Sequence, residues 1–148
     1  MAQQPQMRFK DVVNNLRSIQ NIKNLTYEYI DKYGDVLGHE MKNNELPVTQ
    51  LRKIYNIILI HRRNFNKDSL RIIKPLLAYT AARNVKAKDL CDLLRSLVDK
   101  VNDYEDFEKF YKLMEATLAY YKYYEETEKK GRHRERASYE GWSEDDLR

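Results

Sequence analysis

Hydrophobic positions recur every three to four residues along most of the chain, the spacing typical of helices that bury one face. Six segments follow it: 9–23, 25–41, 48 to about 64, 68 to about 83, 88–102 and 104–128. No segment alternates as a half-buried strand would, and four glycines and three prolines provide few turns. The pattern predicts an all-α fold, a compact helical bundle of about five to six helices.

The length of 148 residues suits one domain with one core. We divide the chain into a flexible leader (1–7), a helical bundle domain (8–131) and a disordered charged tail (132–148). No apolar run reaches the length of a signal peptide or a membrane span, so we expect a cytoplasmic protein. The single cysteine, Cys91, is expected to be a small core residue.

Three local features should disturb the helices. Pro75 lies inside the fourth helical segment and should kink it around Ile72–Lys74. Gly34 and Gly38 should weaken the second segment near its end. The first segment contains several asparagines, which are poor helix formers, so it should fray. A helix cap is expected at Asp68.

The net charge of +4 conceals a strong asymmetry along the chain. The stretch Gln50–Lys88 has a net charge of +9, with one acidic residue, Asp68, against ten basic ones: Arg52, Lys53, Arg62, Arg63, Lys67, Arg71, Lys74, Arg83, Lys86 and Lys88. Residues 89–128 carry a net charge of −6. A concentrated positive surface on a helical scaffold indicates a phosphate-backbone partner, and a merely solvated surface is the alternative.

Helical spacing groups some of these basic residues. Lys67, Arg71 and Lys74 are separated by four and three residues, so they should form one ridge. We expect Arg52, Arg71 and Lys74 to lie on one exposed cationic flank built from the third and fourth segments. Tyr55 and Tyr79, beside this flank, are candidates for stacking on bases.

Catalytic and metal-binding signals are weak. His39, His61 and His133 lie in separate segments without a second ligand at helical spacing. No glycine-rich phosphate loop or nucleophile motif is present. We therefore expect no enzyme, no catalytic residue, no cofactor and no metal. Glu115, inside an apolar run, should form a structural ion pair with Arg83 and join the fourth and sixth helices.

Three blocks of sequence resemble one known family. They are TQLRKIYN (49–56), KPLLAYTAAR (74–83) and DFEKFYKLMEATLAYYKYY (106–124). Together they are similar to the small helical subunit of type III-A CRISPR–Cas effectors, the second protein of the Csm complex. The resemblance covers roughly Leu46–Tyr124. The family pattern holds Arg52, Lys53, Lys74 and Arg83, whereas the other six basic positions depend on the charge argument alone. Glu115, Ala116, Tyr120 and Lys122 match the third block and are interpreted as mainly structural.

The resemblance implies a non-catalytic bundle that serves antiviral defense. Several copies would stack as an inner filament and hold crRNA and target RNA by the phosphate backbone, without sequence specificity. The implied partners are the backbone subunit, the large polymerase-like subunit and further copies of the chain itself, with no membrane contact. Cleavage and second-messenger synthesis would belong to other subunits.

Two other functions remain open. The third and fourth segments could be a helix-turn-helix that reads duplex DNA, although Pro75 and an alanine face fit poorly with a recognition helix. Alternatively, the protein is a pure assembly scaffold whose basic face docks an acidic subunit.

Overall fold

Helices make up the regular secondary structure of the computed structural model, which describes residues 7–132, and they confirm the predicted all-α fold. In chain order they are α1 (Phe9–Ser18), η1 (Ile22–Asn24), α2 (Tyr27–Asn43), α3 (Val48–Leu59), α4 (Lys67–Leu70), α5 (Ile73–Arg83), η2 (Val85–Ala87), α6 (Lys88–Val98) and α7 (Tyr104–Arg132). The two η elements are single turns of 3₁₀ helix. Most of the predicted leader and tail, and His133, lie outside the described residues.

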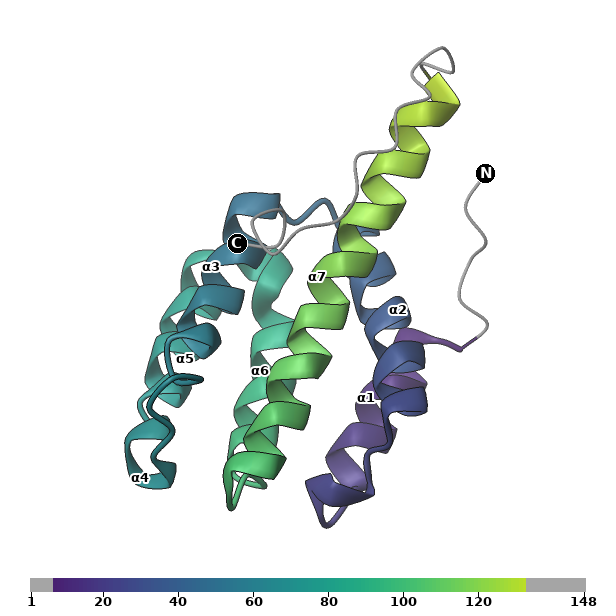
Figure 1. Ribbon diagram of the computed structural model, residues 1–148. Helices are drawn as coiled ribbons and strands as arrows, with labels where there is room; N and C mark the ends of the chain where they lie inside the picture. Colours follow the sequence, from purple (N-terminus) through teal and green to yellow (C-terminus); the bar gives the residue numbers. More distant parts are fainter. Residues whose placement is uncertain (1–6, 133–148) are drawn as a thin grey trace.

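The helices are arranged around α7, the longest of them (Figure 1). On one side lie α3, α4 and α5, on the other lie α1 and α2, and α6 passes behind α7. Helices α2 and α7 run side by side in the same direction. Tyr120 and Tyr124 of α7 donate hydrogen bonds to Asp31 and Asp35 of α2, so equal steps along both helices stay in register.

The core is formed by the apolar faces that the helical spacing predicts. Phe107, Phe110 and Tyr111 of α7 are fully buried, as is Cys91 of α6. Burial raises the pKa of the Cys91 thiol to about 12, so the thiol stays protonated at neutral pH. The expectation of a core cysteine is confirmed.

Gly34 and Gly38 have a different role from the predicted one. Helix α2 continues through both, and the two glycines lie where α2 packs closely against α7. A Cβ added at Gly34 would lie 2.5 Å from Cβ of Ala116. At Gly38 it would lie 2.6 Å from the carbonyl oxygen of Thr117 and 2.7 Å from the amide nitrogen of Tyr121. The absence of side chains at these positions permits the contact.

The expected disturbance at Pro75 is confirmed, and it is a break that separates α4 from α5. Proline has no N–H to donate to the carbonyl of Arg71, four residues earlier, and that carbonyl accepts from Lys74 N at 3.1 Å instead. Within α5, Pro75 occupies the first turn, where a missing N–H is tolerated. The cap of α4 is Asn66, not Asp68, since the Asn66 side chain accepts from the backbone N–H groups of Asp68 and Ser69.

Two other predicted helices end early. The first stops at Ser18, and the asparagine-rich stretch that follows forms η1, where the Asn21 side chain caps the turn. The third stops at Leu59, about five residues before its predicted end. In both places local side-chain or turn hydrogen bonds replace the helical ladder.

Asp35 provides a pH-dependent prediction. Burial raises the pKa of its carboxyl group above the ordinary value of 3.8, and the hydrogen bond from Tyr124 opposes this rise. Because the folded state binds this proton more tightly, the stability contributed by protonated Asp35 is lost as pH rises through the folded pKa. Asp35→Asn keeps an acceptor for Tyr124 and removes the titration. We expect the variant to gain free energy of unfolding relative to the wild type as pH rises from about 4 to 7.

Urea unfolding of both proteins across this pH range, followed by circular dichroism, measures the difference. A variant whose advantage over the wild type shrinks with rising pH would contradict the prediction.

Candidate nucleic-acid interface

Helix α3 exposes the side opposite its buried face. Leu51, Ile54, Tyr55 and Ile58 point into the core. The exposed side therefore carries Lys53, Asn56 and Ile60, at spacings of three and four residues. The periodicity that buries the apolar face of α3 therefore leaves Lys53 exposed to solvent.

Helix α5 exposes a second stripe. Ile73, Leu77 and Thr80 are buried, and Leu76, Tyr79 and Arg83 face outward at spacings of three and four. Tyr79 is 61% exposed. Nη1 of Arg83 donates to the Tyr79 hydroxyl at 3.0 Å, and the guanidinium carbon lies 5.7 Å from the ring centroid. This pairing orients Arg83 without neutralising its charge.

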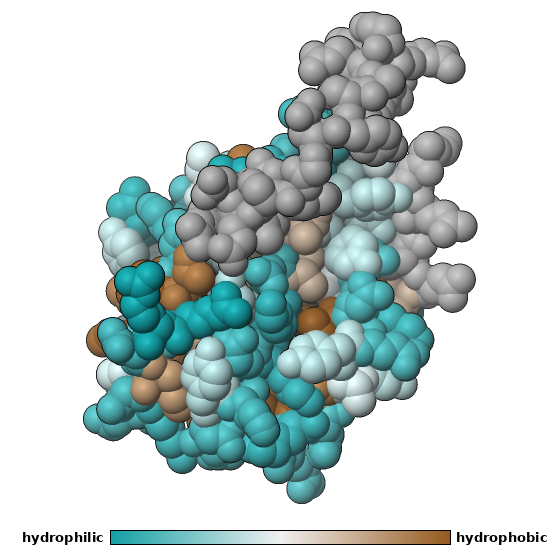
Figure 2. Space-filling view, in the orientation of Figure 1, coloured by the Kyte–Doolittle hydropathy of each residue, from teal (hydrophilic) through white to brown (hydrophobic). Residues whose placement is uncertain are grey.

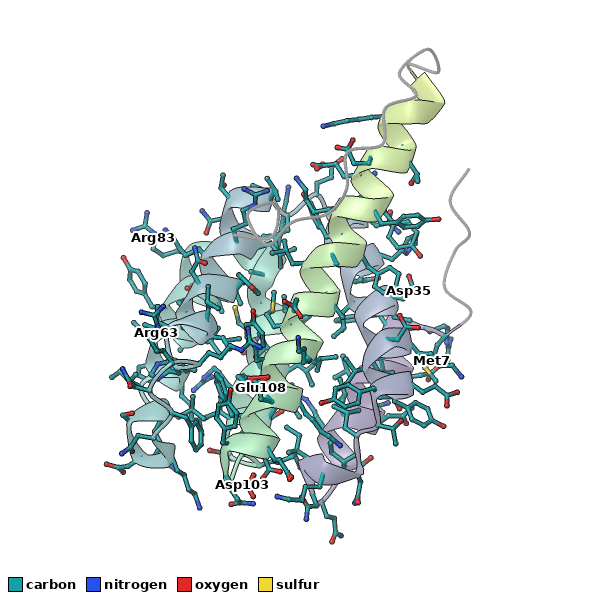
Figure 3. All side chains as sticks on the ribbon, in the orientation of Figure 1. Met7, Asp35, Arg63, Arg83, Asp103 and Glu108 are labelled. Carbon is teal, nitrogen blue, oxygen red and sulfur yellow. The ribbon has the colours of Figure 1, made fainter. Side chains whose placement is uncertain are left out.

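Helices α3 and α5 form a hairpin with α4 at its turn (Figure 1). Antiparallel packing puts the half of α3 that contains Lys53 level with the end of α5 that contains Arg83. Arg63 and Arg83 both lie at the outer margin of the hairpin, away from α7 (Figure 3). We define the cationic edge as the exposed basic residues of the hairpin and of the turn after it: Lys53, Arg63, Arg71, Arg83 and Lys86. Among the described residues, none of these five forms an ion pair with a carboxylate.

Arg62, which the charge argument also selects, is a structural residue. Its Nε and Nη2 donate to the Glu108 carboxylate of α7 at 3.0 and 3.4 Å. The guanidinium carbon lies 4.6 Å from the centroid of the Tyr111 ring. The hydrogen bonds to Glu108 raise the pKa of Arg62 further above its ordinary value. Helical spacing in the third predicted segment, 48 to about 64, already aligns Arg62 with Ile58 on the apolar side.

The acidic segment neutralises two more of the predicted cations. Nζ of Lys74 lies 2.8 Å from both carboxylate oxygens of Asp99, and Lys88 pairs with Asp92 at 2.6 Å. Lys67 donates to the Asn102 amide oxygen at 3.2 Å. Lys74 thus reaches the C-terminal end of α6, where the helix dipole favours cations, and Lys67 reaches the connection between α6 and α7.

The predicted flank of Arg52, Arg71 and Lys74 does not form one exposed surface. Arg71 is exposed at the break between α4 and α5, Lys74 faces α6, and Arg52 is half-buried on the side of α3. Helical spacing alone did not predict these orientations, because the break before Pro75 changes the helical register between Arg71 and Lys74.

Arg83 and Glu115 do not form the predicted ion pair in the part of the chain that the structure describes. Arg83 lies on the outer face of α5 with Tyr79. Glu115 instead accepts from Lys112 at 3.1 Å and from the Tyr111 hydroxyl at 3.3 Å. The Tyr55 and Tyr111 hydroxyl oxygens are 2.6 Å apart, so Glu115 ends a partly buried chain of polar groups.

Of the two tyrosines considered for base stacking, Tyr55 is excluded because it is only 1% exposed in the core. Tyr79 remains exposed beside Arg83. The cationic edge also borders apolar surface. Hydrophobic side chains gather over α3 and α5 at the left margin of the molecule (Figure 2), and Ile60, Ile72 and Leu76 are among the exposed large hydrophobic residues.

Within residues 7–132, no three His, Cys, Asp or Glu side chains converge as metal ligands would. None of the helices in this range is both long and apolar enough to cross a bilayer.

The fold and the charge distribution define a class: small all-α proteins that present a cationic edge on one helical hairpin. The chain belongs to the type III-A Csm2 family, since the family model described as "Csm2 Type III-A" matches residues 24–127, from η1 to near the end of α7. The resemblance seen in the sequence is confirmed. Membership implies a small subunit that assembles with other subunits of the type III-A Csm complex. Comparisons with curated proteins and with solved structures find no match.

Proposed function

We propose that this protein is the non-catalytic small subunit that holds crRNA and target RNA by the sugar-phosphate backbone, without reading sequence. Several copies form the inner filament of the effector complex in the cytoplasm. The observation that supports RNA binding most directly is the cationic edge, whose five basic side chains are exposed and lack a carboxylate partner among the described residues.

Phosphate contacts suit this edge better than base contacts. Its side chains extend from two rigid helices and the turns beside them, and long cationic side chains on such supports neutralise phosphates whatever the base. A helix-turn-helix reader would need a recognition helix that follows directly after a short turn, whereas the break before Pro75 divides the fourth predicted segment into α4 and α5. The contacts within one subunit are few, so stacked copies on one strand would supply avidity.

The test compares two variants that remove equal charge. Arg63→Gln/Arg71→Gln/Arg83→Gln removes three cations from the cationic edge. Arg8→Gln/Lys10→Gln/Lys32→Gln removes three exposed cations from α2 and the region of α1, on the other side of the molecule. Affinity for two single-stranded RNAs of unrelated sequence is measured by fluorescence anisotropy over a range of salt.

We expect the edge variant to lose about tenfold or more in affinity for both RNAs at low salt. The slope of log K against log salt should become shallower by about 2, since each neutralised phosphate on a single strand contributes about 0.7. The control variant should bind as the wild type does. Equal binding by the two variants would refute the proposal. Sequence-selective binding of duplex DNA would favour the helix-turn-helix, and no nucleic-acid binding at low salt, even within the complex, would favour the pure scaffold.

A further inference from the structure

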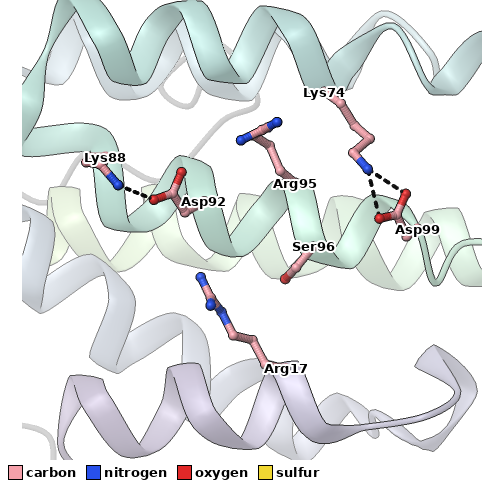
Figure 4. A pocket seen from close by; sticks show the side chains of 7 residues that line it. All are labelled: Arg17, Lys74, Lys88, Asp92, Arg95, Ser96 and Asp99. Carbon is pink, nitrogen blue, oxygen red and sulfur yellow. Dashed lines mark hydrogen bonds and ion pairs between the residues drawn. The ribbon is translucent and has the colours of Figure 1, made fainter.

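A groove lies between α1, α5 and α6, on the side of α5 opposite Arg83, and has a volume of about 500 Å³ (Figure 4). Two ion pairs mark its ends, Lys88 with Asp92 and Lys74 with Asp99. Arg95 of α6 lies between them, and Arg17 reaches toward the same space from α1.

The two arginines in this groove differ from the two lysines. In the part of the chain that the structure describes, neither Arg17 nor Arg95 forms an ion pair. Nε of Arg95 is buried and has no hydrogen-bond partner. The positive charge of Arg17 acts to lower the pKa of Lys88, against the larger effect of the hydrogen bond to Asp92, so Arg17 lies close enough to influence the groove.

A buried guanidinium N–H without a partner is costly, and most such groups are satisfied by a partner. A guanidinium presents its N–H groups as a planar fork that matches an oxyanion with two oxygens. The groove thus has both the space and the unused donors for one such anion.

We infer that this groove receives a carboxylate side chain, aspartate or glutamate, from a neighbouring protein subunit of the complex, with Arg95 and Arg17 as the residues that bind it. The signs of the lining charges favour a protein over RNA. Asp92 and Asp99 stand on either side of Arg95, so a continuous phosphodiester chain along the groove would meet two carboxylates. A single carboxylate can contact the arginines between them. This site is separate from the cationic edge and does not depend on RNA binding there.

The first test uses a probe of defined chemistry on the isolated chain. Acetylated tri-glutamate amide and the oligonucleotide U4 without terminal phosphates each carry about three negative charges. Each is titrated into ¹⁵N-labelled protein while the arginine Nε–H signals are followed by NMR. We expect the peptide to shift the Arg95 signal in a saturable way, with little change from U4. Arg95→Lys, which keeps the charge but removes the fork, should weaken peptide binding by about tenfold, as expected for one charge-assisted hydrogen bond, whereas Arg63→Lys should not.

The second test uses the co-expressed complex. Arg17→Gln/Arg95→Gln should reduce the number of copies of this subunit retained per complex, measured by native mass spectrometry, while the isolated variant binds single-stranded RNA as the wild type does. The inference fails if the peptide leaves the Arg95 signal unchanged, or if U4 shifts it at lower concentration than the peptide. It also fails if the complex retains the variant fully, or if the isolated variant loses RNA affinity as the edge variant does, which would make the groove a phosphate site.

Discussion

Gly38→Ala is expected to lower the free energy of unfolding by about 1–3 kcal/mol. The added methyl group would lie 2.6–2.7 Å from backbone atoms of Thr117 and Tyr121 on α7, so the two helices must move apart. The same substitution on an exposed helix would stabilise it by about 0.5–1 kcal/mol, because alanine favours helix more than glycine does. A lower free energy of unfolding for Gly38→Ala would therefore show that α2 and α7 are in close contact at this position. Urea unfolding followed by circular dichroism measures it.

Gly34 and Ala116 provide the matched control. The closest atom to a methyl group at Gly34 is a side-chain carbon, Cβ of Ala116, at 2.5 Å. Gly34→Ala should therefore be destabilising, and Ala116→Gly should restore part of the loss in the double variant, with a favourable coupling between the two positions. Ala116→Gly should not rescue Gly38→Ala to the same extent, since Gly38 faces backbone. Gly38→Ala as stable as the wild type would show that the helices pack less closely.

Arg62→Ala is expected to cost about 2 kcal/mol of stability, in the range for hydrogen bonds to a charged group. The substitution removes both donors to Glu108 and the cation above the Tyr111 ring. Glu108, with 19% of its side chain exposed, would keep only the Tyr104 hydroxyl among these donors. In the Arg62→Ala background, Glu108→Gln should lower the free energy of unfolding by less than it does in the wild-type protein. The reason is that the ion pair between the two residues is already lost.

The adjacent residue provides a control of the same type. Arg63 is exposed and makes no ion pair with a described carboxylate, so Arg63→Ala should change the free energy of unfolding by less than about 0.5 kcal/mol. Unfolding of both single variants, with RNA affinity measured on the folded proteins, separates the two roles. If Arg63→Ala destabilises the protein and Arg62→Ala leaves it unchanged, these assignments are wrong.

Much of the architecture could be predicted from helical spacing. The buried faces of α3, α6 and α7 are those that the pattern selects, and the break before Pro75 follows from its missing N–H. Arg62 also carried a usable signal, since helical spacing in the third predicted segment aligns it with the core residue Ile58, which conflicts with a role as a free cation.

The remaining features depend on which helices meet. Glycine in a helix is read from sequence as a weakness, and only the approach of α7 shows why Gly34 and Gly38 are suited to their positions. Arg83 and Glu115 have opposite charges but lie on faces that do not meet. Basic and acidic segments that are separate in sequence face each other through Lys74 and Asp99. Such pairings between helices require coordinates.

The register between α2 and α7 also affects how the chain is made. The hydrogen bond between Asp35 and Tyr124 joins residues 89 positions apart. During synthesis, α2 therefore leaves the ribosome well before its partner exists. The surface of α2 that contains Gly34 and Gly38 therefore stays exposed to solvent until α7 has been synthesised. Closure of this long loop is expected to limit the rate of folding.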